Sequence, residues 1–220
     1  EVGDLQALQQ LSFAGNYNSI VFVEQLKRLA NLREIGIHLH GSAQLGDHDM
    51  ARYMEALKSS LAVMGKQGLQ SLEIRNDDTV IGEKLMDLLC YSPCLRKLVI
   101  HGGCISRLSK QMALLVNLRH LYIGVSNIKQ DDLCVLGSIP TLLFVRLFVE
   151  NGPDERLAIS SHQFQCLKEF IFISYGGGLE MLFLQEAMPE LRRLSLSFSA
   201  EETDCKMGFE FSFKHLASLE

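Results

Sequence analysis

The chain has 220 residues, of which 47% are hydrophobic and 21% are charged, so it carries enough apolar material for a sizeable core. Its formal net charge of −5 at pH 7 argues against nucleic acid or an anionic membrane as the main partner, because both require a dense basic surface. The uncharged run 133–145 contains Gly137 and Pro140 and is too short for the roughly 20 residues that span a bilayer. The sequence also has no Asn-x-Ser/Thr glycosylation site, which favours an intracellular protein over an ectodomain.

A six-residue template, Leu-x-x-Φ-x-Φ in which Φ is an apolar residue, occurs eight times along the chain. The leucines that open it are Leu8, Leu32, Leu69, Leu95, Leu118, Leu142, Leu167 and Leu191. Six of the seven intervals between them are 23 to 26 residues long, and the seventh is 37. This period and this template are typical of leucine-rich repeats.

Strand geometry predicts how such repeats fold. Side chains of a strand alternate between its two faces, so Leu121 and Ile123 point one way and Tyr122 points the other. Because one repeat cannot bury its apolar side chains alone, repeats stack and pair their strands. The predicted fold class is α/β: a leucine-rich-repeat solenoid with a curved parallel sheet on the concave side and short helices and loops on the convex side. We expect residues 1–220 to form one domain of about eight repeats, with the start of a ninth at 216–219, inside a longer protein.

Helices are predicted in the segments that link the strands. The 37-residue interval has apolar residues at helical spacing from Met50 to Met64, preceded by Asp47 or Asp49 as the capping residue. A second helix is expected over 81–90. Short helices or single helical turns are expected at 108–115, 131–136 and 179–187.

No catalytic or nucleotide-binding motif is present, so the sequence predicts no enzyme, no catalytic residue and no cofactor or metal held by this chain. The six cysteines are expected to be reduced and to serve as small apolar filler. The alternative is a zinc site, although the spacing matches no common zinc module. Its ligands would be Cys90, Cys94, His101 and Cys104. The Gly176–Gly178 tripeptide is expected to form a turn, with a phosphate-binding loop as the alternative.

The strand side chains that point away from the core predict a binding surface. In the early repeats they are polar and of mixed charge, whereas in the later repeats they include large apolar groups flanked by arginines, which are enriched at protein interfaces. The predicted site residues are Tyr122, Phe144, Arg146, Phe148, Ile171, Ile173 and Arg193, with Arg119 added from the second template position. Burial against other parts of a longer protein stays open for the apolar groups. Two alternatives stay open for the basic residues at the second template position. They are simply solvated, or they form a basic strip that contacts an acidic surface.

Several repeats resemble a known family. The stretches 1–11, 29–35 and 132–142 read EVGDLQALQQL, LANLREI and DLCVLGSIPTL. They are similar to the leucine-rich-repeat region of plant intracellular immune receptors, of the coiled-coil nucleotide-binding leucine-rich-repeat (NLR) type that is abundant in grasses. Such disease resistance proteins have an N-terminal coiled-coil domain, a nucleotide-binding switch and a C-terminal repeat domain, and only the last corresponds to this chain. Contacts made by the repeats vary between receptors, so the resemblance assigns no role to any single residue here.

The resemblance implies a module with two tasks: holding the nucleotide-binding switch closed, and recognising a pathogen effector directly or through a guarded host protein. It places ADP or ATP in the nucleotide-binding domain of the parent protein, and it implies oligomers only through that protein. The implied location is cytoplasmic, with the nucleus and the periphery of the plasma membrane as further sites. The alternative function is the substrate-binding repeat domain of an F-box type ubiquitin ligase adaptor, which would require an F-box segment upstream.

Overall fold

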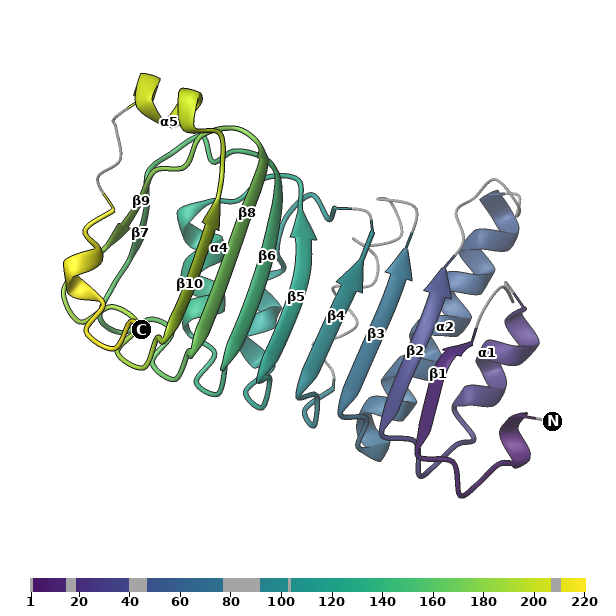
Figure 1. Ribbon diagram of the computed structural model, residues 1–220. Coiled ribbons are helices and arrows are strands. Elements are labelled where there is room, and N and C mark those ends of the chain that lie inside the picture. The colour runs from purple at the N-terminus through teal and green to yellow at the C-terminus, as the bar shows by residue number, and fades with distance from the viewer. Residues whose placement is uncertain (1, 15–18, 40–46, 77–91, 103, 207–210) are drawn as a thin grey trace. The chain divides into compact units, whose positions relative to one another are not determined.

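The computed structural model describes residues 2–14, 19–39, 47–76, 92–102, 104–206 and 211–220. The chain divides into two compact units, Glu1–Gly103 (unit 1) and Cys104–Glu220 (unit 2). Both repeat one structural element, a strand followed by a connecting segment that returns to the start of the next strand (Figure 1). This element is the one that the eight templates predict.

Unit 1 is a parallel four-stranded sheet with helices on one face (Figure 1). Its strands, in sequence and spatial order, are β1 (Gln10–Ala14), β2 (Glu34–Leu39), β3 (Ser71–Asn76) and β4 (Lys97–His101). Its helical segments are η1 (Val2–Asp4), a short 3-10 helix, α1 (Ile20–Leu26) and α2 (Asp47–Gln67). The core lies between the sheet and these helices, because the apolar template residues point toward them.

Unit 2 contains a second parallel run of four strands and a separate two-stranded sheet. The main strands are β5 (His120–Val125), β6 (Phe144–Asn151), β8 (Glu169–Gly176) and β10 (Arg193–Ser197). The small sheet pairs β7 (Leu157–Ile159) with β9 (Met181–Phe183). The helical segments are η3 (Lys110–Leu114), α4 (Gln130–Gly137), α5 (Ala200–Lys206) and η4 (Phe213–His215). Helix α4 and the small sheet lie on the same side of the main strands (Figure 1).

The observed register confirms the predicted template. Each main strand begins two residues after its template leucine, and equivalent template positions pair between neighbouring strands. The template leucines from Leu32 to Leu191 are at most 1% exposed. On β5, Leu121 and Ile123 are buried, while Tyr122 is half-buried on the opposite face. The predicted inward face is therefore the core.

One hydrogen-bond arrangement recurs at the start of six main strands, β2, β3, β4, β6, β8 and β10. The backbone N–H groups of Leu143 and Phe144 both donate to the carbonyl oxygen of Arg119, at N···O distances of 2.9 and 3.0 Å. The corresponding residues at the starts of β2, β3, β4, β8 and β10 bond in the same way to the preceding strand. Glu220 makes the same bond that Leu143 makes, because each is the second residue of its template. The N–H of Glu220 donates to the carbonyl oxygen of Arg192 at 3.0 Å, so the template that starts at Leu219 begins like the others. This shared acceptor fixes the register, because it ties one defined residue of each repeat to its counterpart in the previous one.

Helix α2 is the helix predicted in the 37-residue interval. It begins at Asp47, so Asp47 and Asp49 lie in its first turn rather than ahead of it. Its apolar stripe from Tyr53 to Met64 is buried, as the helical spacing predicts. The buried hydroxyl of Ser60 donates to the carbonyl oxygen of Val23 at 2.7 Å, and this bond ties α2 to α1.

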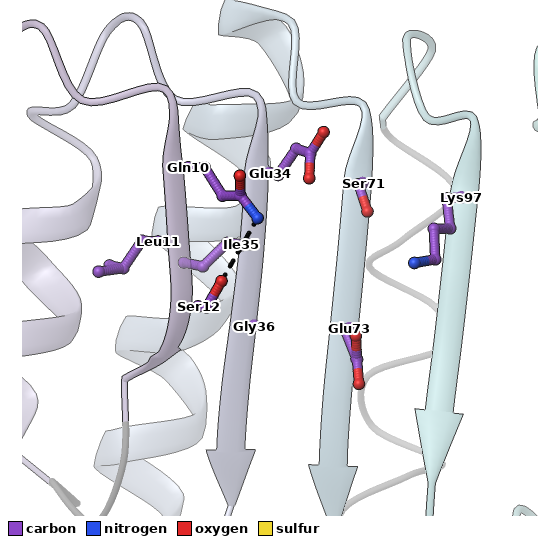
Figure 2. Close-up of a pocket in the computed structure, with 9 residues that line it drawn as sticks. All are labelled: Gln10, Leu11, Ser12, Glu34, Ile35, Gly36, Ser71, Glu73 and Lys97. Atoms are coloured by element: carbon purple, nitrogen blue, oxygen red, sulfur yellow. Dashed lines mark hydrogen bonds between the residues drawn. The ribbon is translucent and has the colours of Figure 1, made fainter.

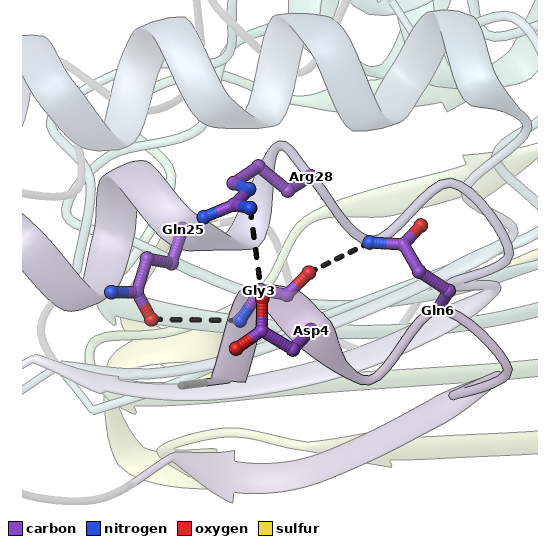
Figure 3. A network of polar contacts seen from close by, with 5 residues as sticks. All are labelled: Gly3, Asp4, Gln6, Gln25 and Arg28. Carbon is purple, nitrogen blue, oxygen red and sulfur yellow. Dashed lines mark hydrogen bonds and ion pairs between the residues drawn. The ribbon is translucent and has the colours of Figure 1, made fainter.

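A polar network holds η1 against α1 (Figure 3). The backbone N–H of Gly3 donates to Oε1 of Gln25 at 3.5 Å, and the side chain of Gln6 donates to the carbonyl oxygen of Gly3 at 2.7 Å. The guanidinium of Arg28 lies 3.6 Å from Oδ1 of Asp4. These contacts are mostly exposed, so they orient η1 but contribute little to stability.

The helical turn predicted over 179–187 is wrong. The apolar run Met181–Phe183 is strand β9, and it pairs with β7. The side chain of Gln130, on α4, donates to the carbonyl oxygen of Ala158 at 2.8 Å and accepts from its N–H at 2.7 Å, so it satisfies the free edge of β7. A three-residue apolar run is compatible with either a strand or a helical turn. Met181–Phe183 is a strand because it pairs with β7.

The other predicted connecting segments have mixed outcomes. The turns expected at 108–115 and 131–136 are confirmed as η3 and α4. The helix expected over 81–90 lies outside the described residues. The glycine turn at Gly176–Gly178 is confirmed: Gly177 has a φ of +149°, and a Cβ placed on it would lie 2.6 Å from the Cα of Gly152. Glycine is needed there because two chain turns cross at backbone contact.

Candidate functional site

The outward strand face of unit 2 carries seven of the eight predicted site residues. They are Tyr122 on β5, Phe144, Arg146 and Phe148 on β6, Ile171 and Ile173 on β8, and Arg193 on β10. All are exposed or half-buried, and the register places them on four adjacent strands. The eighth residue, Arg119, is exposed and immediately precedes β5, so it lies beside this face rather than on it.

Four side chains form an aromatic–arginine cluster at the centre of this face: Tyr122, Arg146, Phe148 and Tyr175. The Cζ atom of Arg146 lies 5.3 Å from the ring centroid of Tyr122 and 5.2 Å from that of Phe148. The two rings lie 5.0 Å apart, and Phe148 stacks on Tyr175 at 5.9 Å with 12° between the ring planes. A guanidinium over two ring faces is attracted by the ring quadrupoles, so the cluster is held together by its own contacts.

The register explains why these side chains meet. Tyr122 is paired with Arg146, and Phe148 is paired with Gly124, which has no side chain. The rings of Tyr122 and Phe148 therefore meet diagonally over Gly124, at a separation that cross-strand neighbours reach easily. Beside them, His120 stacks on Phe144 with centroids 4.6 Å apart and 10° between the planes.

Charges on this face are unevenly compensated. Arg193 lies 3.7 Å from a carboxylate oxygen of Glu169, and Glu150 accepts a hydrogen bond of 2.9 Å from the hydroxyl of Ser126. Arg146, by contrast, makes no hydrogen bond and no ion pair within the described part of the chain; its contacts are the two rings. In register, its neighbours on the adjoining strands are Tyr122 and Ile171, neither of which is acidic.

Two aromatic side chains of this face, Tyr175 and His120, are absent from the predicted site. Tyr175 is 70% exposed and lies at the ninth template position, where regular repeats carry an inward asparagine. Strand β8 continues to Gly176, so the alternation simply carries on and Tyr175 points outward. His120 opens β5 on the same face. Strand alternation predicts the outward face for both positions from the sequence, but the sequence does not predict that β8 extends as far as Gly176.

No arrangement among the described residues suggests catalysis. No group of three or more His, Cys, Asp or Glu in that part of the chain is placed to hold a metal ion. Of the proposed zinc ligands, Cys90 lies outside the described residues, and Cys94 is exposed. Burial, and secondarily the nearby carboxylate of Glu150, raise the pKa of the Cys104 thiol, which makes it a weaker nucleophile and metal ligand.

The outward strand face of unit 1 is polar and carries a small pocket (Figure 2). Its lining residues are Gln10, Leu11, Ser12, Glu34, Ile35, Gly36, Ser71, Glu73 and Lys97. The cavity measures about 90 Å³, well below the roughly 300 Å³ at which small-molecule sites begin. Of the lining residues, Glu73 lies 3.1 Å from Nε2 of His101 and 3.9 Å from Nη2 of Arg75, so its carboxylate is already engaged.

An apolar recess of about 520 Å³ lies on the core side of β10. It is lined by Leu194, Leu196, Phe198, Phe211, Phe213 and Leu219. The leucines of β10 are half-buried here, whereas their counterparts Phe170 and Phe172 on β8 are fully buried. The recess is thus a continuation of the repeat core, and it faces away from the aromatic–arginine cluster.

The family described as Leucine-rich repeat region matches residues 1–220, the whole chain. The chain belongs to the leucine-rich-repeat family. A curated protein of rice (Oryza sativa subsp. japonica), Disease resistance protein RGA5, is 27% identical over 224 residues, which cover 100% of this chain and 20% of that protein. The chain thus spans about a fifth of the length of this relative. Together these matches confirm the resemblance to the repeat region of plant NLR proteins that the sequence shows.

No solved structure matches the chain significantly. Among the described residues, none of the helices combines the length and the hydropathy required to cross a bilayer. The α/β leucine-rich-repeat fold thus rests on the family match and on the parallel strands of each unit.

Proposed function

We propose that this chain is the recognition and autoinhibition module of an intracellular plant immune receptor, and that it senses a pathogen effector directly or through a host protein. The observation that carries the proposal is the outward face of unit 2, where aromatic and aliphatic groups surround Arg146, an arginine that has no ionic partner among the described residues. Buried aromatic and arginine side chains supply most of the binding energy at protein interfaces. The similarity to a rice disease resistance protein supports the immune context.

The module acts without catalysis, through differential binding. If the repeats bind the closed nucleotide-binding domain and the effector with different affinities, effector binding shifts the population toward the open, oligomerising form. We place ADP or ATP in the nucleotide-binding domain of the parent protein rather than in this chain. We place the receptor in the cytoplasm, which gives the repeats access to translocated effectors and to host proteins.

The test replaces Tyr122 and Phe148 together by glutamate in the full-length receptor. Two carboxylates in the aromatic–arginine cluster break the ring contacts and place charge where an apolar partner surface would lie. If the face binds the effector, we expect the cell-death response to the matching effector to be lost. If it binds the closed nucleotide-binding domain, we expect a response without effector. An unchanged response, at equal receptor abundance, would overturn the proposal.

The matched control is Val21→Glu. Val21 lies on α1 in unit 1 and is 63% exposed, so glutamate there also replaces an exposed apolar group without disturbing the core. We expect this variant to respond like the unmodified receptor. A loss as large as that of the double variant would show that the assay reports general damage rather than a binding surface.

A further inference from the structure

We infer that the aromatic–arginine cluster is the subsite for a carboxylate of the partner protein, presented by an Asp or Glu whose neighbours in the partner are apolar. This inference rests on the proposed function, since it names the chemistry of the group that the recognition surface takes. It assigns Arg146 as the residue that selects the acidic group, and Tyr122 and Phe148 as the rings that orient the guanidinium, with Tyr175 stacked on Phe148.

The geometry of Arg146 is suited to this task. Its guanidinium is held over two ring faces, at 5.2 and 5.3 Å, so its planar fork of N–H donors is oriented before any partner arrives. A preoriented side chain loses less conformational entropy on binding. Once a partner covers the exposed cluster, its apolar groups and the rings exclude water from the contact, and a charge-assisted bidentate bond to a carboxylate is stronger in such surroundings.

The charge distribution selects an acidic partner group. Within the described part of the chain, Arg146 has no carboxylate partner, while the nearby Glu169 is engaged by Arg193 at 3.7 Å. The exposed Arg119 and Lys168 lie along the edge where the strands begin, and they add positive potential on the approach. An acidic group therefore gains attraction at this site and displaces no ion pair that Arg146 makes within the described residues.

The net charge and the aliphatic surroundings favour a protein over a nucleic acid. Nucleobases can stack on aromatic rings, so Phe148 does not separate the two classes, but Ile171, which flanks Arg146 on the same face, offers aliphatic surface that suits apolar side chains. The chain carries a net charge of −5, which weakens the attraction of a polyanion.

The experiment pans a random twelve-residue peptide library, displayed on phage, against the 220-residue chain. The most enriched acidic peptide and its Glu→Gln (or Asp→Asn) version are then synthesised and titrated against the unmodified chain, Arg146→Ala and Arg146→Lys. We expect enriched peptides to carry an acidic residue between apolar ones. Loss of the carboxylate should weaken binding about 10- to 100-fold in the unmodified chain, in line with a charged hydrogen-bonded pair. In Arg146→Ala, loss of the peptide carboxylate should weaken binding less than about threefold, because the carboxylate and Arg146 act through the same contact.

Two variants separate this subsite from a general charge effect. Arg146→Lys keeps the charge but lacks the planar fork, so it should recover only part of the affinity. Arg52→Ala removes one positive charge from the exposed surface of α2 in unit 1, outside the candidate site, and should change affinity less than about threefold. Equal losses in Arg52→Ala and Arg146→Ala would overturn the inference, and so would tight binding of a fluorescent poly(U) RNA that depends on Arg146.

The outcomes also separate this inference from the proposed function. Peptides that bind the cluster without an acidic residue, and lose binding in the Tyr122→Glu and Phe148→Glu double variant, would overturn the carboxylate subsite and leave the recognition surface intact. An unchanged cell-death response in that double variant would overturn the proposed function itself.

Discussion

Replacing Leu147 by alanine tests the packing that separates the two faces of the sheet in unit 2. Leu147 is fully buried on β6, and in register it lies between Ile123 on β5 and Phe172 on β8, both also fully buried. The change removes three carbon atoms, which costs about 2.4 kcal/mol at about 0.8 kcal/mol per carbon. A residual cavity of about 60 Å³ adds about 1.4 kcal/mol. We therefore expect the free energy of unfolding to fall by about 3 to 4 kcal/mol.

The neighbouring residue is the matched control. Arg146→Ala, on the opposite face, removes only exposed contacts with two rings, and it should cost no more than about 1 kcal/mol. Both variants can be compared by urea unfolding followed by far-ultraviolet circular dichroism, because the chain has no tryptophan. A loss below about 1 kcal/mol in Leu147→Ala, or an equal loss in the two variants, would refute the assignment of faces.

Three further predictions concern single groups. Ser60→Ala removes the hydroxyl that bonds to the carbonyl of Val23 and should lower the free energy of unfolding by about 1 kcal/mol; an unchanged urea midpoint would show that this bond is not needed to hold α2 on α1. Thr203→Val removes the acceptor of the buried N–H of Leu179, a bond of 2.9 Å, and should cost about 1 to 3 kcal/mol by the same measurement, with a cost near zero counting against that contact. Burial raises the pKa of Tyr53 to about 12 from 10.0. The folded state thus keeps this proton longer than the unfolded state, so stability is lost as pH rises from about 10 to 12. Tyr53→Phe should flatten that decline in thermal melts, and an equally steep decline would exclude Tyr53 as its source.

The strand register could be predicted because one leucine per repeat marks it. A residue such as Leu118 or Leu142 is at most 1% exposed and stands at a fixed distance before its strand, so its sequence position fixes the faces of all residues that follow. This parity is also why Tyr122, Arg146 and Phe148 could be assigned to one face without a structure.

The connecting segments were less predictable, because their structure depends on partners remote in sequence. Helix α1 was not predicted: its β-branched residues Ile20, Val21 and Val23 favour a strand. The missed signal is Ser19, which caps the helix by accepting a hydrogen bond from the N–H of Phe22 at 3.3 Å. Strand β9 forms only because β7 is present to pair with it.

The candidate site was predictable as a list of residues but not as an arrangement. Strand alternation predicts which face each side chain lies on. The diagonal contact between the rings of Tyr122 and Phe148 depends on the register that places Phe148 opposite Gly124. The lack of an ionic partner for Arg146 within the described chain depends on which carboxylates lie nearby, and sequence spacing does not encode that.

The alternation of faces along β6 can be measured directly by cysteine labelling. Single cysteines at positions 145, 146, 147 and 148 are treated with a maleimide in the native chain, and the labelled peptides are quantified by mass spectrometry. We predict that cysteines at the outward positions 146 and 148 react at least about tenfold faster than those at the buried positions 145 and 147, which react only after local opening. Equal rates at all four positions, or faster labelling at 145 and 147, would contradict both the fold and the binding surface derived from it.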